Sequence, residues 1–358
     1  MMESKKLKAR LELEDGSVYT GYSFGAPQSV AGEVVFNTSM VGYAESLTDP
    51  SYHGQILIFT YPLIGNYGVP GKRVIDKLDE WFESDRIQIK GLIIHEYSFD
   101  FSHWSAQKSL GEWLKEHNVP GLYNIDTRML TKCLRDEGTM LGRIRFFHEE
   151  INFYDPNKSN LVEEVSIKEP IEYGHGDKTI IVVDCGCKEN IIRSLLSLDL
   201  HVRRVPWDYD FTNEHCHGLI LSNGPGDPKK CEKTIEHVRR VMERQLPIFG
   251  ICLGNQILAL AAGADTYKLK FGHRSQNQPC IEVGTKRCYI NSQNHGYAVD
   301  GRTLPEGWEP WFINANDGTN EGIRHVLKPF MSVQFHPEAA PGPVDTRILF
   351  EDFKRMLS

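Results

Sequence analysis

The chain has 358 residues, of which 40% are hydrophobic and 25% are charged, and its formal net charge is −8 at pH 7. This length favours two domains, and the balance is that of an ordinary globular protein. Nucleic-acid binders and membrane-surface proteins normally carry basic patches, so the negative charge argues against both as general functions. We therefore expect no nucleic-acid partner and no membrane partner.

The first 150 residues predict a β-rich domain with a few helices. Short apolar runs separated by turn residues indicate strands, and Asp15-Gly16 is typical of a tight hairpin. A helix is expected over residues 105–118. A second helix is expected to begin after Asp126, as its N-cap, and to end at Gly138.

Residues 151–177 are polar and interrupted by proline and glycine, which predicts a connection between domains. The predicted division is therefore a domain at 1–150, a connector at 151–177 and a second domain at 178–358. The second domain alternates strand and helix patterns, which favours a mainly parallel sheet flanked by helices. The fold class is α/β, with the β-rich domain first.

Parallel sheets hold their sites at the carboxyl ends of strands, and the sequence FGICLGNQ falls at such an end. Cys252 stands there between Gly250 and Gly254, after a predicted strand and before a predicted helix. This matches a nucleophile elbow, in which a strained turn projects the reactive side chain and flanking side chains would collide. The helix start favours a thiolate, and the N–H of Leu253 is placed to donate to an oxyanion.

A thiol nucleophile needs a base and a group that orients the base. A predicted strand beginning at Met331 is followed by His336, with Glu338 two residues further on. The order suits a Cys252–His336–Glu338 triad, in which the imidazole takes the thiol proton and the carboxylate holds the tautomer.

We expect no metal site and no nucleotide site in this chain. The cysteines and histidines of 185–187 and 215–217 lack a second ligand pair at a recognisable spacing. The glycine-rich stretch 65–73 does not have the spacing of a phosphate-binding loop.

Four stretches occur in order over about the last 180 residues: SNGPGDP, FGICLGNQ, SQNHGYAV and VQFHPEA. As a set they resemble a class I glutamine amidotransferase domain. The first half resembles the N-terminal domain of the carbamoyl-phosphate synthetase small chain, through stretches such as LEDGSVYTGYSFGA, TYPLIGNYGVP and PGLYNIDTRMLTKCLR. The similarity covers nearly the whole chain apart from the connector.

The resemblance implies that Cys252, His336 and Glu338 are catalytic and that Gly224 and Leu253 supply the oxyanion N–H groups. It also implies an L-glutamine site drawn from both predicted domains. The residues implied to bind glutamine are Ser51, Gly224, Gly226, Leu253, Gln256, Asn294, Gly296 and Tyr297.

The resemblance further implies the reaction and the partner. Cys252 would attack the side-chain amide of glutamine, form a γ-glutamyl thioester and release ammonia. The ammonia would pass to a large carbamoyl-phosphate synthetase subunit, which combines it with bicarbonate for pyrimidine and arginine synthesis. No cofactor is expected in this chain, and ATP and magnesium are expected in the large subunit.

The cytoplasm is the expected compartment. The first residues are charged and lack the apolar core of a signal peptide. The eight cysteines are scattered through the chain, which favours reduced thiols.

Two other functions stay open on the residues. One is a stand-alone cysteine hydrolase of γ-glutamyl or peptide bonds, which would act independently of any partner. The other is a non-catalytic glutamine sensor, in which a glutamine-like affinity label would fail to modify Cys252. One position departs from the family pattern, because many members carry histidine where this chain has Asn255; we expect that difference to affect kinetics and not the chemistry.

Overall fold

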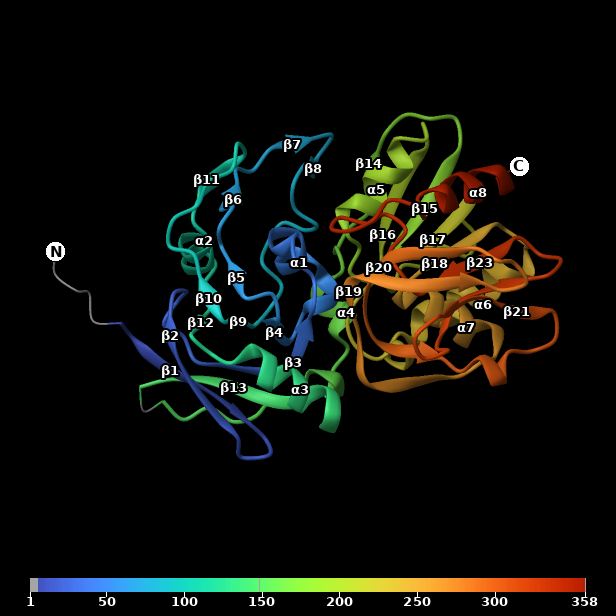
Figure 1. Cartoon of the computed structure of the whole chain (residues 1–358). Coiled ribbons are helices and arrows are strands. Elements are labelled where there is room, and N and C mark those ends of the chain that lie inside the picture. Colours follow the sequence, from blue (N-terminus) through green and yellow to red (C-terminus); the bar gives the residue numbers. More distant parts are fainter. Residues whose placement is uncertain (1–5, 148, 358) are drawn as a thin grey trace. The chain divides into compact units, whose positions relative to one another are not determined.

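The computed structural model describes residues 6–147 and 149–357 (Figure 1). The chain divides into two compact units. Unit 1 holds the described residues of Met1–Arg73 and Asp79–Lys158, and unit 2 holds Val74–Leu78 and the described residues of Ser159–Ser358. The division after Lys158 falls inside the predicted connector, the rest of which contributes a helix and a strand to unit 2.

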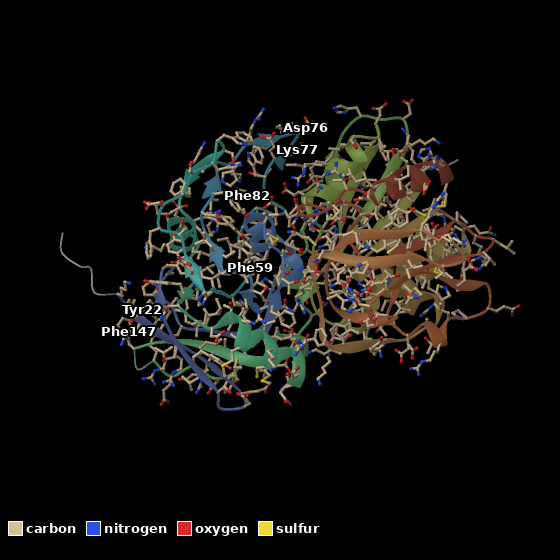
Figure 2. The ribbon with its side chains drawn as sticks, viewed as in Figure 1. Tyr22, Phe59, Asp76, Lys77, Phe82 and Phe147 are labelled. Atoms are coloured by element: carbon tan, nitrogen blue, oxygen red, sulfur yellow. The ribbon has the colours of Figure 1, made fainter. Side chains whose placement is uncertain are left out.

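Unit 1 is built around a closed barrel with the strand order β1-β13-β3-β4-β9-β12-β2. Closure pairs every barrel strand on both sides, so the barrel exposes no strand edge. Its barrel strands are β1 (Lys8–Leu13), β2 (Val18–Ser23), β3 (Val30–Asn37), β4 (Gln55–Phe59), β9 (Gly91–Ile93), β12 (Gly121–Tyr123) and β13 (Met140–Phe146). Phe59 at the end of β4 is buried, whereas Phe147, just past β13, is exposed (Figure 2).

Shorter elements surround the barrel. They are α1 (Tyr43–Thr48), η1 (Pro50–Tyr52), β5 (Leu63–Ile64), β6 (Val69–Pro70), β10 (Glu96–Tyr97), β11 (Ala106–Lys108), α2 (Leu110–Glu116), α3 (Thr127–Glu137) and η2 (Pro156–Lys158). The strands β7 (Val74–Ile75) and β8 (Leu78–Asp79) pair with each other.

The hairpin and one helix of this unit were predicted correctly. The turn at Asp15-Gly16 joins β1 and β2, which pair antiparallel. The side chain of Asp126 accepts a hydrogen bond from the Met129 N–H at 2.9 Å and caps α3, which ends at Gly138.

The predicted start of the helix within 105–118 was wrong. Residues Ala106–Lys108 form β11, which pairs with β6, and the helix begins only after Ser109. Ser109 and Glu112 form a reciprocal capping box, and this local signal fixes the first turn of α2.

Unit 2 holds a mixed sheet with the order β14-β16-β15-β17-β18-β23-β22-β21-β19-β20. The run from β16 to β23 is parallel, and antiparallel strands extend it on both sides. Its strands are β14 (Ile171–Tyr173), β15 (Thr179–Asp184), β16 (His201–Pro206), β17 (Gly218–Leu221), β18 (Ile248–Ile251), β19 (Thr266–Glu282), β20 (Cys288–Val299), β21 (Trp308–Asn314), β22 (Asn320–His325) and β23 (Phe330–Val333). The predicted α/β class, with a β-rich domain first, is confirmed.

The helices of unit 2 cover both faces of this sheet (Figure 1). Helices α5 and α8 contribute apolar side chains to one core, and α6 and α7 contribute to another. The helical elements are η3 (Pro228–Lys230), η4 (Gly301–Thr303), α4 (Leu161–Val165), α5 (Glu189–Leu196), α6 (Glu232–Glu243), α7 (Leu253–Ala262) and α8 (Ile348–Met356).

A buried ion pair fixes the end of β15. Asp184 accepts from Arg204 through Nε at 2.9 Å and Nη2 at 2.8 Å, and from the backbone N–H groups of Ile167, Gly186 and Cys187. Burial opposes the charge of Arg204, but Asp184 raises the pKa of that guanidinium above its usual value.

We expect Asp184→Ala to lower the free energy of unfolding by about 3–5 kcal/mol, because Arg204 would keep a buried, uncompensated charge. Urea unfolding measures the loss. Asp208→Ala is the matched control, since Asp208 is exposed and pairs only with Lys233, and it should change stability by about 0.5 kcal/mol or less. Equal losses for the two variants would contradict the assignment.

Candidate active site

Cys252 occupies a strained turn between β18 and α7. Its φ is 54° and its ψ is −104°, a backbone region that non-glycine residues rarely adopt. Cys252 is also the N-cap residue of α7, so the predicted strand–turn–helix arrangement is confirmed.

The two glycines that flank Cys252 are required by close backbone contacts. A Cβ added to Gly250 would lie 2.5 Å from the Gly254 carbonyl oxygen, and one added to Gly254 would lie 2.1 Å from the Leu221 carbonyl oxygen. Both distances are far inside van der Waals contact with backbone, which cannot move aside as a flexible side chain can. The predicted reason for the glycines is confirmed.

We expect Gly254→Ala to destabilise the protein by more than about 2 kcal/mol, since its methyl group collides with the end of β17. Gly263→Ala, at the other end of α7, is the control. Its added Cβ meets nothing within 4 Å at φ +103°, so it should cost only about 1 kcal/mol of backbone strain. Thermal unfolding of both variants distinguishes steric collision from loss of glycine in general.

His336 and Glu338 lie together in the core of unit 2. His336 Nδ1 is 2.6 Å from Glu338 Oε1. The backbone N–H of His336 donates to the Ser292 carbonyl at 2.9 Å. Because Nδ1 is held by the carboxylate, Nε2 is the ring nitrogen left for Cys252. Nε2 has no hydrogen-bond partner among the described residues, and Cys252 helps to raise the pKa of the imidazole. The Cys252 Sγ also lies 3.6 Å from the carbonyl oxygen of Asn294.

Lys188, which sequence reasoning missed, completes this group. It is buried at the start of α5, and its Nζ lies 3.0 Å from Glu338 Oε1 while also donating to the carbonyl of Ala339. Asn190 donates through Nδ2 to the carbonyl of Glu338. Lys188 therefore holds the carboxylate of Glu338, and Asn190 holds the backbone of the same residue.

The charges of these buried groups are coupled. Burial would lower the pKa of His336, but the charge of Glu338 and the interaction with Cys252 raise it to about 10. Burial would raise the pKa of Glu338, but Lys188 and His336 hold it at about 2. This coupling favours an imidazolium beside the Glu338 carboxylate at neutral pH.

Other predicted residues gather beside Cys252. Gln256 donates through Nε2 to the Tyr297 carbonyl at 2.8 Å and to Gln334 Oε1 at 3.0 Å. Tyr297 lies on β20 with Asn294 and Gly296. Helix α7 and strand β20 therefore hold the predicted glutamine-binding residues of these two motifs on either side of the thiol.

The loop after β17 approaches the same place. A Cβ added to Gly224 would lie 2.8 Å from Leu253 Cδ2, so the backbone of Gly224 adjoins the first residue of α7. Gly226 has φ +84° and lies beside Leu161. Ser51 belongs to η1 of unit 1, where its N–H donates to Asp49 Oδ1, and its part in glutamine binding stays a prediction.

Two family models match this chain. Residues 181–356 match the model of the glutamine amidotransferase class-I family, and residues 11–144 match that of the carbamoyl-phosphate synthase small chain, CPSase domain. The chain therefore carries a carbamoyl-phosphate synthase small-chain domain followed by a class I glutamine amidotransferase domain.

The relatives that match this chain are much longer proteins. It is 51% identical over 358 residues to the carbamoyl-phosphate synthase [ammonia], mitochondrial, of Homo sapiens, a match of 99% of this chain and 24% of the relative. It is 52% identical over 380 residues to multifunctional protein pyr-3 of Neurospora crassa, covering 96% of this chain and 21% of the relative. The chain thus spans about a quarter of the length of these relatives or less.

Asn255 has a structural role. It is buried, accepts from Ser332 Oγ at 2.8 Å and donates through Nδ2 to Gln334 Oε1 at 3.1 Å. The same Gln334 oxygen accepts from Gln256. Asn255 is therefore linked to Gln256 through Gln334, and its expected effect on kinetics stays a prediction.

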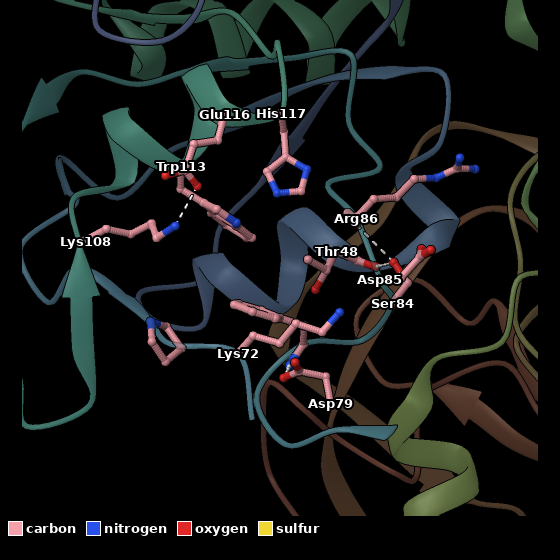
Figure 3. A pocket seen from close by; sticks show the side chains of 12 residues that line it. Thr48, Lys72, Asp79, Ser84, Asp85, Arg86, Lys108, Trp113, Glu116 and His117 are labelled. Atoms are coloured by element: carbon pink, nitrogen blue, oxygen red, sulfur yellow. Dashed lines mark hydrogen bonds and ion pairs between the residues drawn. The ribbon is translucent and has the colours of Figure 1, made fainter. Parts of the chain in front are cut away.

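A separate pocket of about 190 Å³ lies in unit 1 (Figure 3). None of the predicted site residues lines it. It places lysines and carboxylates side by side, and Lys108 already pairs with Glu116 at 2.6 Å. These mixed charges favour no single class of ligand.

Among the described helices, none is long and apolar enough to cross a membrane.

Proposed function

We propose that this chain hydrolyses L-glutamine to glutamate and ammonia, with Cys252 as the nucleophile. The observation that carries the proposal is the strained cysteine at a helix start, interacting with an imidazole that Glu338 holds at 2.6 Å. Thiolate, base and orienting carboxylate are the groups that acyl transfer through a thioester requires.

In the first half-reaction the Cys252 sulfur attacks the side-chain amide carbon of glutamine. The carbonyl oxygen becomes an oxyanion, and the N–H groups of Leu253 and Gly224 are proposed to donate to it. Leu253 is the first residue of α7, so its N–H has no acceptor within the helix. His336 protonates the departing nitrogen, ammonia leaves and a γ-glutamyl thioester remains.

In the second half-reaction water attacks the thioester. Neutral His336 takes a proton from the water, the carbon–sulfur bond breaks, and the thiolate and glutamate are released. Glu338 and Lys188 keep the imidazole in place through both steps.

Glutamine is proposed to be held by its α-groups. The Nε2 donors of Gln256 are occupied by Tyr297 and Gln334, which leaves Oε1 to accept from the substrate ammonium. Ser51, Gly226, Asn294, Gly296 and Tyr297 are proposed to complete the site with hydroxyl and backbone groups.

The ammonia is proposed to pass to a large carbamoyl-phosphate synthetase subunit. Relatives that contain this chain as a small part of their length are named carbamoyl-phosphate synthase, which supports such a partner. ATP, magnesium and bicarbonate would be used there, for pyrimidine and arginine synthesis. The cytoplasm is the proposed compartment, although several relatives are named mitochondrial, and cell fractionation decides between the two compartments.

The test is a glutaminase assay on the purified chain, alone and with the synthetase. We expect glutamate release that the partner stimulates, and covalent modification of Cys252 by a chloroketone analogue of glutamine. Full hydrolysis that ignores the partner would favour a stand-alone hydrolase. No hydrolysis and no labelling would favour a glutamine sensor.

A further inference from the structure

A second cluster of reactive side chains lies in unit 2, on three strands that sequence order keeps apart. His273 on β19, His295 on β20 and Glu321 on β22 are all buried. One donor atom from each lies within 4.8 Å of the other two. His273 Nδ1 is 3.2 Å, and His295 Nε2 is 3.9 Å, from the same Glu321 Oε1.

The opposite ring nitrogen of each histidine is already engaged. His273 Nε2 lies 2.8 Å from Asp317 Oδ2, and His295 Nδ1 lies 2.9 Å from the Tyr297 carbonyl oxygen. Metal-binding histidines characteristically donate their second N–H to a carboxylate or a backbone carbonyl in this way. The nitrogens that point inward are then the ones with lone pairs to offer.

The inward side is rich in acceptors. A carbonyl can only accept, so His295 Nδ1 carries a proton and Nε2 is the ring nitrogen that can bind a metal. Its Nε2 lone pair therefore faces Gln293 Oε1 at 3.2 Å as well as Glu321 Oε1. Glu321 Oε2 is buried without a hydrogen-bond partner among the described residues. Asn314 Nδ2 lies 3.4 Å from both Glu321 Oε1 and His273 Nδ1, so the cluster has one amide donor, and a cation would compensate the remaining acceptors.

We propose that His273, His295 and Glu321 bind one zinc ion, with Gln293 Oε1 as the fourth ligand. Donor atoms about 2.0–2.1 Å from a tetrahedral zinc lie about 3.3–3.4 Å apart. The observed separations of 3.2, 3.2 and 3.9 Å between neighbouring donors are close to that spacing. Imidazole and carboxylate are ligands that zinc accepts, and Glu321 offsets part of its charge.

The proposed ion would be structural. It would tie β19, β20 and β22 together at one point, next to Asn294, whose carbonyl faces Cys252. This inference goes beyond glutamine hydrolysis and contradicts the sequence-based expectation of no metal. That expectation considered only ligands close together in the chain, whereas these come from separate strands.

The experiment uses the full chain. Zinc content is measured by elemental analysis after purification without added metal, and cobalt is then titrated into chelator-treated protein while the visible absorption of tetrahedral cobalt is followed. We expect about one metal ion per chain. Glu321→Gln and His273→Asn should each weaken cobalt binding at least 100-fold, and Asp317→Asn should weaken it about 10- to 100-fold. His175→Asn, at an exposed histidine, should leave binding unchanged.

Far-ultraviolet circular dichroism establishes that each variant is folded before its affinity is compared. Folded wild-type protein that retains no zinc and gives no tetrahedral cobalt band would overturn the proposal, and would leave the cluster as a hydrogen-bond network. So would cobalt binding that Glu321→Gln leaves as strong as in the His175→Asn control. Both results are independent of glutaminase activity, so they do not bear on the proposed reaction.

Discussion

Cys252→Ala should reduce glutamine hydrolysis by about 10⁴-fold or more, because the proposed thioester forms on the Cys252 sulfur. The expected loss is in kcat, since the glutamine-binding groups on α7 and β20 remain in place. In the complex with the synthetase, carbamoyl phosphate formation from glutamine should collapse while formation from added ammonia persists. Steady-state assays with each nitrogen donor measure both activities.

Cys288→Ala is the matched control. Cys288 is exposed at the start of β20, and we expect its replacement to leave both activities unchanged. Near wild-type glutamine turnover by Cys252→Ala would rule out the nucleophile assignment. Loss of the ammonia-dependent activity as well would show that the variant damages the complex and not only the thiol chemistry.

Local patterns in the sequence predicted much of the fold around this thiol. Glycine is needed on both sides of Cys252 because a side chain there would collide with backbone of β17, β18 or the start of α7. The spacing of the glycines in the sequence was therefore enough to place the turn. Capping by Asp126 is likewise local. The start of α2 was missed because the capping box at Ser109 was overlooked, although that signal is also local.

Long-range pairing was harder to predict. The barrel of unit 1 depends on β13 closing onto β1 and β3, which no short pattern specifies. Lys188 contacts Glu338, which is 150 positions away in the sequence. Its sequence signal is a lysine in the short turn between a buried strand and a helix, in VVDCGCKEN, since a lysine in such surroundings normally needs a partner. The separate strands of His273, His295 and Glu321 hid that cluster for the same reason.

The second large effect is expected from Lys188→Met. Lys188 and Glu338 are buried, and removing one partner of a buried pair leaves the other charge uncompensated, so the free energy of unfolding should fall by about 3–5 kcal/mol at pH 7. The pKa of Glu338 should rise, because Lys188 is the main group that lowers it. His336 would then lose part of its orientation, and kcat/KM for glutamine should fall, with Lys354→Met as an exposed control.

The pH dependence separates this electrostatic role from simple packing. A carboxylate whose pKa is depressed to about 2 contributes stability above its unfolded-state pKa, and that contribution is lost as the pH falls toward 2. Without Lys188 the folded-state pKa rises, so the acid loss of kcat/KM should begin at higher pH than in the wild type, whereas the acid loss of stability that Glu338 contributes should become smaller. Urea unfolding and initial rates between pH 3 and 8 measure both shifts. The double variant Lys188→Met, Glu338→Gln removes both charges and should be more stable than Lys188→Met alone, whereas a purely packing role for Lys188 predicts no such recovery and no shift in the acid limb.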